Sequence, residues 1–318
     1  MDLIRSVGVT VNDYDLNRLG NTLQHYEKLG CTGAELFIMP LQVIFGGELN
    51  QRRCDQAAEA CDKSNLEFSV HAPMSLNFLD RQHLELHKQI CRSTIEFCHF
   101  IGARTLVVHP GNSTVEQSIE GYDAIMAQEA SIYREMAEYA ASFDIVLALE
   151  NMPPTEDIIH GKVSNYGLIP HLVAKQIEAV GCDNFRGTLD FSHACIAAEY
   201  HGGDLLGSLS TFQKHVNHLH FHDSFGSAHT MKTPYTGEAA AWGMGDLHLP
   251  LGWGSLPWED VLSHLSVQPD TMITVEIDHK YSSDFEIASS IERAHELAAL
   301  LDGAHSEIVE PQYILAAA

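Results

Sequence analysis

IVLALE, residues 145–150, is a short apolar run that ends in a carboxylate, and similar runs recur along the whole chain. Seven more of them predict strands: SVGVTV (6–11), AELFIM (34–39), EFSVHA (67–72), TLVVHP (105–110), RGTLDF (186–191), VNHLHF (216–221) and MITVEI (272–277). The segments between them carry apolar residues three and four positions apart, which indicates amphipathic helices. The clearest are DLNRLGNTLQHYEKLG (15–30), NQRRCDQAAEACDKS (50–64), RQHLELHKQICRSTIEFCHFIG (81–102) and EASIYREMAEYAASF (129–143).

Eight strands that alternate with helices predict an α/β fold, a single-domain (β/α)8 TIM barrel over residues 1–302. A doubly wound open sheet is the rival, but no GxGxxG or GxxxxGK[ST] motif follows any strand. Two long irregular stretches, 151–165 and 223–255, follow the fifth and seventh strands and would lie on the top face as lids or substrate walls. Residues 303–318 form a C-terminal tail whose role the sequence does not decide.

The composition indicates a globular chain without a membrane segment. Of 318 residues, 45% are hydrophobic, yet no apolar run approaches the roughly 18 residues of a membrane helix. The first residues lack the basic and apolar regions of a secretory signal, so we expect a cytosolic protein. Seven cysteines form no CxxC pair and are expected to be free thiols. Homo-oligomerisation is left open.

The charge balance bears on the partner. A formal net charge of -25, from 43 acidic and 18 basic residues, weighs against nucleic acid, which is bound through Lys and Arg. The two top-face loops contain the basic residues Lys162 and Lys232, which are too few to bind a DNA backbone. Twenty histidines are an unusually large number, and imidazole is the commonest metal ligand. The balance favours a small-molecule substrate.

Six consecutive strands end in a side chain that can bind a metal. These residues are His71, His109, Glu150, Asp190, His220 and Glu276. Barrel enzymes place their chemistry at this C-terminal rim, so the donors are expected to meet there. Asp190 and His193 form a DxxH step, and Asp246 and His248 form a DxH step ahead of a Gly-Trp-Gly turn. A donor set without thiolates suits a divalent ion, with zinc or manganese favoured and one to three ions per chain.

At these residues the sequence resembles the xylose isomerase-like barrel superfamily, which includes sugar isomerases, epimerases and endonuclease IV. The resemblance covers nearly the whole chain and rests on SVHAPMSLNF (69–78), LVVHPG (106–111), LALENM (147–152), LDFSHA (189–194), HLHFHDS (218–224), GDLHLPLGWG (245–254) and TVEID (274–278). It implies that Glu150, Asp190, His220 and Glu276 match the metal site of the epimerases. It also implies that His71, His109, His193, Asp246 and His248 match the further zinc ligands of endonuclease IV. The first predicted strand, however, lacks the histidine that endonuclease IV carries in its opening motif.

Two chemistries compete for these residues. In an isomerase or epimerase acting on a small sugar or polyol, Glu150 and Glu276 would carry protons on opposite sides of the substrate, as the resemblance implies, and His193 would contact a substrate oxygen. In a hydrolase or lyase related to endonuclease IV, all nine residues would hold a metal cluster that acts on a phosphoester or on abasic-site DNA. The net charge favours the isomerase or epimerase. A third hypothesis is a non-catalytic metal- or ligand-binding barrel, and the paired carboxylates argue against it.

Other side chains are assigned to the surroundings of the site. His218, His220 and His222 share one face of their strand, and we expect only His220 at the height of the metal, with His222 lining the substrate pocket. Trp253 is the best candidate to stack on a sugar ring. Asn151 would bind substrate or, like Asp223, orient a ligand residue. Glu35 is interpreted as a structural hydrogen-bond acceptor.

Overall fold

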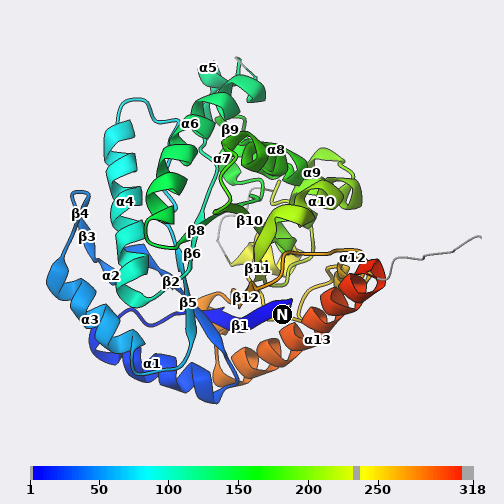
Figure 1. Ribbon diagram of the computed structural model, residues 1–318. Coiled ribbons are helices and arrows are strands. Elements are labelled where there is room, and N and C mark those ends of the chain that lie inside the picture. Colours follow the sequence, from blue (N-terminus) through cyan, green and yellow to red (C-terminus); the bar gives the residue numbers. More distant parts are fainter. Residues whose placement is uncertain (1–2, 120, 232–236, 310–318) are drawn as a thin grey trace, which may run out of the picture.

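The computed structural model describes residues 3–119, 121–231 and 237–309. Eight parallel strands close into a barrel in the order β1-β12-β11-β10-β8-β6-β5-β2, and helices surround it (Figure 1). The strands are β1 (Ile4–Thr10), β2 (Gly33–Phe37), β5 (Glu67–His71), β6 (Thr105–Val108), β8 (Val146–Glu150), β10 (Phe185–Asp190), β11 (Val216–Phe221) and β12 (Thr271–Val275). The prediction of a (β/α)8 barrel is confirmed.

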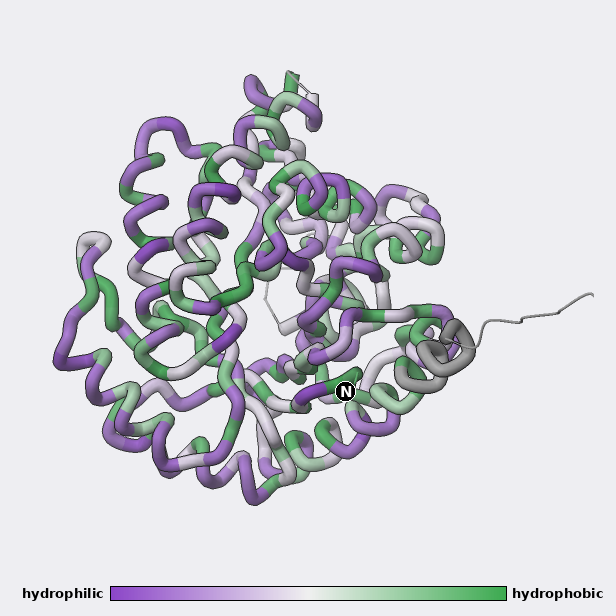
Figure 2. The backbone as a smooth tube through the Cα atoms, in the orientation of Figure 1, coloured by the Kyte–Doolittle hydropathy of each residue, from purple (hydrophilic) through white to green (hydrophobic). Residues whose placement is uncertain are grey.

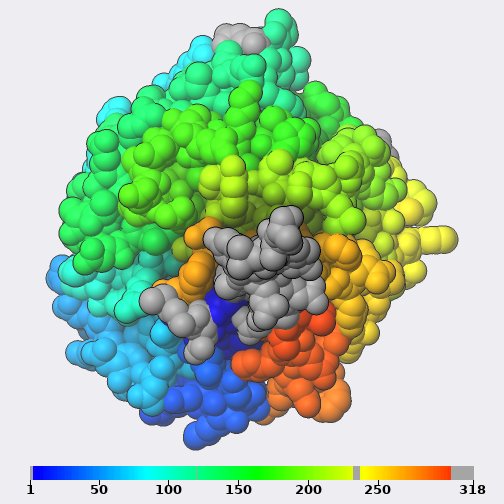
Figure 3. Space-filling view, turned by 45° about the vertical axis from the view of Figure 1, so that its right-hand side comes forward, coloured from blue at the N-terminus to red at the C-terminus, as the bar shows by residue number. Residues whose placement is uncertain are grey.

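Helices follow the strands around the ring. They are α1 (Leu16–Lys28), α2 (Ile38–Leu41), α3 (Gln51–Cys61), α4 (Leu84–Ile101), α5 (Val115–Ser118), α6 (Tyr122–Ala141), α7 (Glu156–Ile159), α8 (Pro170–Val180), α9 (Phe191–His201), α10 (Leu205–Phe212), α11 (Glu238–Trp242), α12 (Trp258–Leu262) and α13 (Asp284–Val309). In Figure 3 the sequence colours run around the molecule until red α13 lies beside the blue N-terminal segments, which α13 contacts at β1. The last helix thus returns to the first strand.

Local signals explain where the helices begin and end. Asp15 and Asn50 cap α1 and α3 by accepting hydrogen bonds from backbone N–H groups of the first turn. Gly102 ends α4 in a left-handed conformation with φ of 71°, which glycine adopts without steric cost. Along the outer helices hydrophilic and hydrophobic residues alternate (Figure 2), as expected for elements with one face on the barrel and one in water.

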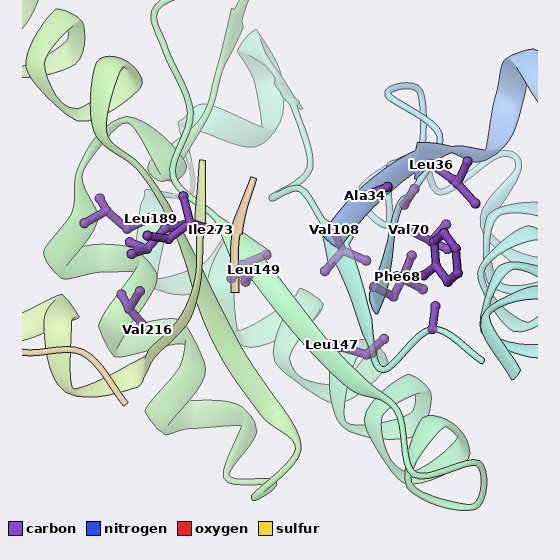
Figure 4. Close-up of a cluster of buried hydrophobic side chains, with 14 of the residues drawn as sticks. Ala34, Leu36, Phe68, Val70, Val108, Leu147, Leu149, Leu189, Val216 and Ile273 are labelled. Carbon is purple, nitrogen blue, oxygen red and sulfur yellow. The ribbon is translucent and has the colours of Figure 1, made fainter. Parts of the chain in front are cut away.

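The two-residue period of the strands separates the core from the site. On β8, Leu147 and Leu149 point outward and belong to the hydrophobic core, whereas Glu150 lies in the other phase. Figure 4 shows such outward side chains, among them Leu147 and Leu189, in the layer between strands and helices. Inward positions of the same strands are therefore the ones that can hold polar residues at the mouth.

The two predicted top-face loops contain some regular structure. The first includes α7 and the short strand β9 (Val163–Ser164), which pairs with β7 (Ser113–Thr114), and it leads to the 3-10 helix η1 (Tyr166–Leu168). The second includes α11 and a bridge between Asp223 and Leu249. The remaining short elements are β3 (Ile44–Phe45), β4 (Glu48–Leu49), η2 (Gln213–His215) and η3 (His279–Tyr281).

The C-terminal helix is longer than the sequence suggested. α13 runs to Val309, so residues 303–309 of the predicted tail continue this helix, and residues 310–318 lie outside the described part. All seven cysteines are free thiols, as predicted. Among the described helices, none combines the length and the apolar character needed to cross a bilayer.

Candidate metal centre

Four residues from neighbouring strands meet at the C-terminal mouth of the barrel. Glu150 and Asp190 are the last residues of β8 and β10, His220 lies on β11, and Glu276 directly follows β12. His220 Nδ1 lies 3.1 Å from Glu150 Oε1 and 3.5 Å from Glu276 Oε2. One donor atom each of Glu150, Asp190 and His220 lies within 4.8 Å of the others. The structure therefore brings the four residues of the predicted central site together, all of them buried.

A second group lies on the β5 and β6 side of Glu150. His109 Nε2 is 3.2 Å from His71 Nε2 and 3.0 Å from Glu150 Oε2. His71 Nδ1 lies 2.9 Å from the carbonyl oxygen of Ala72 and donates its proton there, which leaves Nε2 as the free lone pair. His71, His109 and Glu150 can thus present three donor atoms to one ion.

A third group forms on the opposite side, where the second long loop returns over the barrel. His193 Nε2 and His248 Nε2 each lie 3.1 Å from Asp246 Oδ2. His222 joins them: its ring stacks on that of His248 with centroids 4.0 Å apart, and its Nε2 lies 3.6 Å from Asp246 Oδ1. The structure thus places His193, Asp246 and His248 together, as expected.

Two histidines, His220 on β11 and His222 directly after it, lie near candidate metal ligands, although only His220 was expected there. His220 reaches the central group, and His222, just beyond the strand, reaches Asp190 at 3.0 Å as well as Asp246. The strand ends at Phe221, so His222 lies directly beyond it, where its side chain is fully buried. Both nitrogens of His193 face protein groups, Nδ1 toward the Asn151 carbonyl oxygen at 3.1 Å and Nε2 toward Asp246, which favours its predicted role as a ligand over contact with a substrate.

Supporting residues hold these donors in place. The Asn151 side-chain amide donates to the Asp190 carbonyl oxygen at 2.8 Å, and its Oδ1 accepts from the Asp190 backbone N–H at 2.9 Å. This pairing fits the positioning role, and contact of Asn151 with a substrate stays a prediction. Asp223 Oδ2 accepts hydrogen bonds from Gly252 and Gly254, both at 2.9 Å, and so fixes the Gly-Trp-Gly turn.

Trp253 in that turn is half exposed and lies 5.6 Å from the ring of Tyr281, so stacking on a sugar remains a prediction. Of the two lysines of the top-face loops, Lys162 pairs with Asp157 at 2.7 Å and Lys232 lies outside the described residues. A cleft of about 660 Å³ opens beside Asp246 between the two long loops, with Thr155 on one wall and Met244 on the other. Both loops therefore line an approach to the centre.

Glu35 is the residue whose place in the site the sequence did not show. It lies on β2, fully buried, and accepts hydrogen bonds from Ser69 Oγ at 2.7 Å and His218 Nε2 at 2.9 Å. Its Oε1 lies 3.2 Å from Nε2 of His220, the nitrogen opposite the one that faces Glu150. Glu35 and Ser69 occupy paired, inward-facing positions on β2 and β5, and this alternation was the sequence signal that could have placed Glu35 near the site.

Burial and ion pairing set the protonation of the centre. Burial alone would raise the pKa of Glu150, but the adjacent histidines, His220 foremost, hold it well below its ordinary value. Burial opposes the charged form of His220, yet the facing carboxylates, Glu276 foremost, raise its pKa well above the ordinary value. Against the same effect of burial, Asp246 raises the pKa of His248 to about 9. Protons thus balance the carboxylates, and a divalent cation would displace them.

The residues fit a divalent metal ion. Within the described ranges, the ion pairs recorded for the carboxylates of Glu150, Asp190, Asp246 and Glu276 all involve histidine. Buried Oε1 of Glu276 has no hydrogen-bond partner there, although an unpaired buried carboxylate oxygen is costly. Imidazole nitrogens and carboxylate oxygens are the donors that zinc and manganese accept.

Comparison with known proteins agrees with the fold. The family model described as xylose isomerase-like TIM barrel matches residues 23–301. No curated protein sequence matches the chain. Solved structures with the same fold include a D-tagatose 3-epimerase-like protein (21% identity, TM-score 0.66, covering 94% of this chain and 98% of that one). L-Ribulose 3-epimerase follows at 14% identity and TM-score 0.65, covering 98% and 99%. A Thermus thermophilus protein soaked with ZnCl2 has 19% identity and TM-score 0.60, covering 91% and 98%.

Proposed function

Because the chain belongs to the xylose isomerase-like TIM barrel family, we propose that it is a divalent-metal-dependent isomerase or epimerase of a small sugar or polyol-type substrate. Glu150, Asp190, His220 and Glu276 would hold the ion, and zinc or manganese suits these donors. The fold shared with a D-tagatose 3-epimerase-like protein and with L-ribulose 3-epimerase supports a carbohydrate substrate.

The observation that carries the proposal is the position of two buried carboxylates on the same imidazole nitrogen. Oxygen atoms of Glu150 and Glu276 lie 3.1 and 3.5 Å from His220 Nδ1. Glu276 follows β12, which pairs with β11 on one side, and Glu150 ends β8, which lies beyond β10 on the other side. Inverting a carbon next to a carbonyl takes one group that removes the proton from one face and a second that returns a proton to the other face. Two carboxylates at one point supply such a pair.

The chain's own residues then divide the work. When bound, a divalent cation supplies a Lewis acid that polarises the substrate oxygens and acidifies the C–H bond between them. Glu276 and Glu150 would exchange protons with opposite faces of that carbon. Asn151 keeps the Asp190 backbone in place, and the cleft beside Asp246 admits the sugar.

Deuterium exchange tests this function. The full chain, loaded with zinc or manganese, is incubated with a panel of ketoses in D2O, and exchange at the carbon beside the carbonyl is followed by NMR. Wild-type protein is expected to exchange at least one ketose, and Glu276→Gln is expected to slow the exchange by about 10²-fold or more at equal metal content. The exposed Glu59 on α3 serves as the matched control, since Glu59→Gln should retain the wild-type rate.

Two results would count against the proposal. A wild-type rate in Glu276→Gln at equal metal content would remove this residue from the proton carriers. Lack of exchange with every ketose, although the metal is bound, would contradict the isomerase or epimerase activity itself.

A hydrolase or lyase related to endonuclease IV is the second candidate. It is favoured by the two flanking groups, since His71 and His109 lie beside Glu150, and His193 and Asp246 form a group with His248. The net charge of -25 opposes a DNA substrate. Three ions per chain together with nicking of abasic-site DNA at low enzyme concentration would favour this candidate over the epimerase.

A further inference from the structure

We propose that His222 is the fourth protein ligand of a closed zinc site, formed with His193, Asp246 and His248, that fastens the loop residues 237–255 to the barrel mouth. This inference rests on the metal dependence in the proposed function and adds a structural ion, separate from the central site. It assigns His222, for which the sequence predicted a place in the substrate pocket, to metal binding.

The four side chains surround one point. Each offers a nitrogen or oxygen atom, and the four atoms all lie within 4.8 Å of one another. Tetrahedral zinc, with ligands at about 2.0–2.2 Å, needs donor atoms roughly 3.3 Å apart. Asp246 Oδ2 lies 3.1 Å from both His193 Nε2 and His248 Nε2, and Asp246 Oδ1 lies 3.6 Å from His222 Nε2. These distances are close to the spacing of a tetrahedral site, with His222 facing the second oxygen of the same carboxylate.

The nitrogens that face the point are free to bind. His193 Nδ1 lies 3.1 Å from the Asn151 carbonyl oxygen and donates its proton there, so Nε2 carries the lone pair. His222 is fully buried, and its Nδ1 has no hydrogen-bond partner among the described residues, which leaves Nε2 as its directed donor atom. His222 and His248 stack with an interplanar angle of 7°, and both present Nε2 toward Asp246.

Four protein ligands leave no position open for a substrate. Catalytic zinc sites hold three protein ligands and keep an open position, whereas structural sites are filled by four. His193 and His222 belong to the barrel, at the start of α9 and just beyond β11, while Asp246 and His248 belong to the loop. An ion bound by two residues from each side therefore links the loop to the rim.

The backbone of the loop is built for this link. His248 has a left-handed conformation with φ of 46°, which is unfavourable for a residue with a side chain. Its carbonyl oxygen accepts a hydrogen bond from the Asp278 N–H at 2.9 Å, and Leu249 pairs with Asp223. Strain of this kind persists where the surroundings impose it, often at ligand sites. The same loop lines the cleft beside Asp246, so its attachment shapes the approach to the central site.

The alternative is that His222 binds the central ion, because His222 Nε2 also lies 3.0 Å from Asp190 Oδ2. Metal counting separates the two cases. Chelator-treated full chain is titrated with zinc and with Co2+, the ions per chain are measured by elemental analysis, and the visible absorption of tetrahedral Co2+ reports the geometry. Backbone hydrogen exchange of residues 237–255 is followed in the metal-free and zinc-loaded states, without substrate.

His222→Asn is expected to lose one class of zinc site, with affinity lowered at least tenfold, since even an outer partner of a ligand contributes about 10–100-fold. Asp246→Asn should lose the same class, and zinc should protect residues 237–255 from exchange in wild type but not in His222→Asn. The exposed His201 at the end of α9 supplies the control, because His201→Asn should match wild type in all three measurements.

Equal zinc content and an unchanged Co2+ spectrum in His222→Asn would overturn the inference. Loss in His222→Asn of a zinc site that Asp246→Asn retains, with the Asp246-dependent site intact, would likewise overturn it and assign His222 to the central ion. The epimerase proposal fails on a different result, absent deuterium exchange in metal-loaded wild type, so the two failures are distinguishable.

Discussion

Glu129→Gln is expected to change how the stability of the barrel depends on pH. Glu129 lies on α6 with no exposed surface, and its Oε1 accepts a hydrogen bond from the Gly111 backbone N–H at 2.9 Å. Burial raises the pKa of this carboxyl from its ordinary 4.5 to about 7, and the nearby Tyr166 hydroxyl and the Gly111 N–H offset only part of that effect. The folded protein therefore binds this proton more tightly than the unfolded chain.

The sign and the size follow from this difference. The protonated Glu129 carboxyl contributes its full stabilisation of the folded state below pH 4.5, and this contribution is lost as the pH rises to about 7. At about 1.4 kcal/mol for each pH unit, the rise from 4.5 to about 7 corresponds to about 3 kcal/mol of unfolding free energy. The glutamine variant is neutral at every pH and keeps an acceptor for Gly111. Relative to wild type, it should be more stable at pH 8 than at pH 5 by about this amount.

Denaturant unfolding of the metal-free protein at pH 5, 6, 7 and 8 measures the effect. The comparison between variant and wild type cancels the titration of the histidines at the mouth. Glu59→Gln on the surface of α3 is the control and should shift stability by less than about 0.5 kcal/mol throughout. If the difference between Glu129→Gln and wild type is the same at pH 5 and pH 8, the buried carboxyl does not hold its proton and the reasoning is wrong.

Three further substitutions test the site and its support. Glu35→Gln should weaken binding of the central ion by about 10–100-fold in calorimetric titration, because it removes the charge that faces His220 Nε2; unchanged affinity would refute this positioning role. Gly254→Ala should lower stability by about 1–3 kcal/mol in thermal unfolding, since a Cβ there would overlap the Ser224 carbonyl oxygen, and a stability equal to wild type would show that the turn yields. His109→Ala should lower the number of ions per chain without unfolding the protein, and equal metal content would argue against an ion beside it.

Much of the fold could be predicted from the sequence because strand residues alternate between two environments. On β10, Leu189 faces the helices and Asp190 faces the barrel, and the same alternation marked all eight strands. The meeting of Glu150, Asp190 and His220 was also predictable, since the carboxyl ends of parallel strands share one rim. Neither inference needed contacts between residues far apart in the chain.

What the sequence did not show depends on such contacts. Glu35 is a structural hydrogen-bond acceptor, as predicted, but its contact with His220 across the barrel on β11 was beyond the reach of a local pattern. The position of His222 depends on where β11 ends and on the course of the loop that carries Asp246. The extension of α13 to Val309 was not predicted, since residues 303–318 were assigned to a tail.

A crystal structure of the zinc- or manganese-loaded protein, with anomalous scattering measured at the absorption edge of the metal, tests the central claim most directly. We expect an anomalous peak bounded by Glu150, Asp190, His220 and Glu276, with each of the four side chains within bonding distance. A fully loaded crystal in which no peak lies among these residues would contradict the metal centre and the chemistry proposed for it.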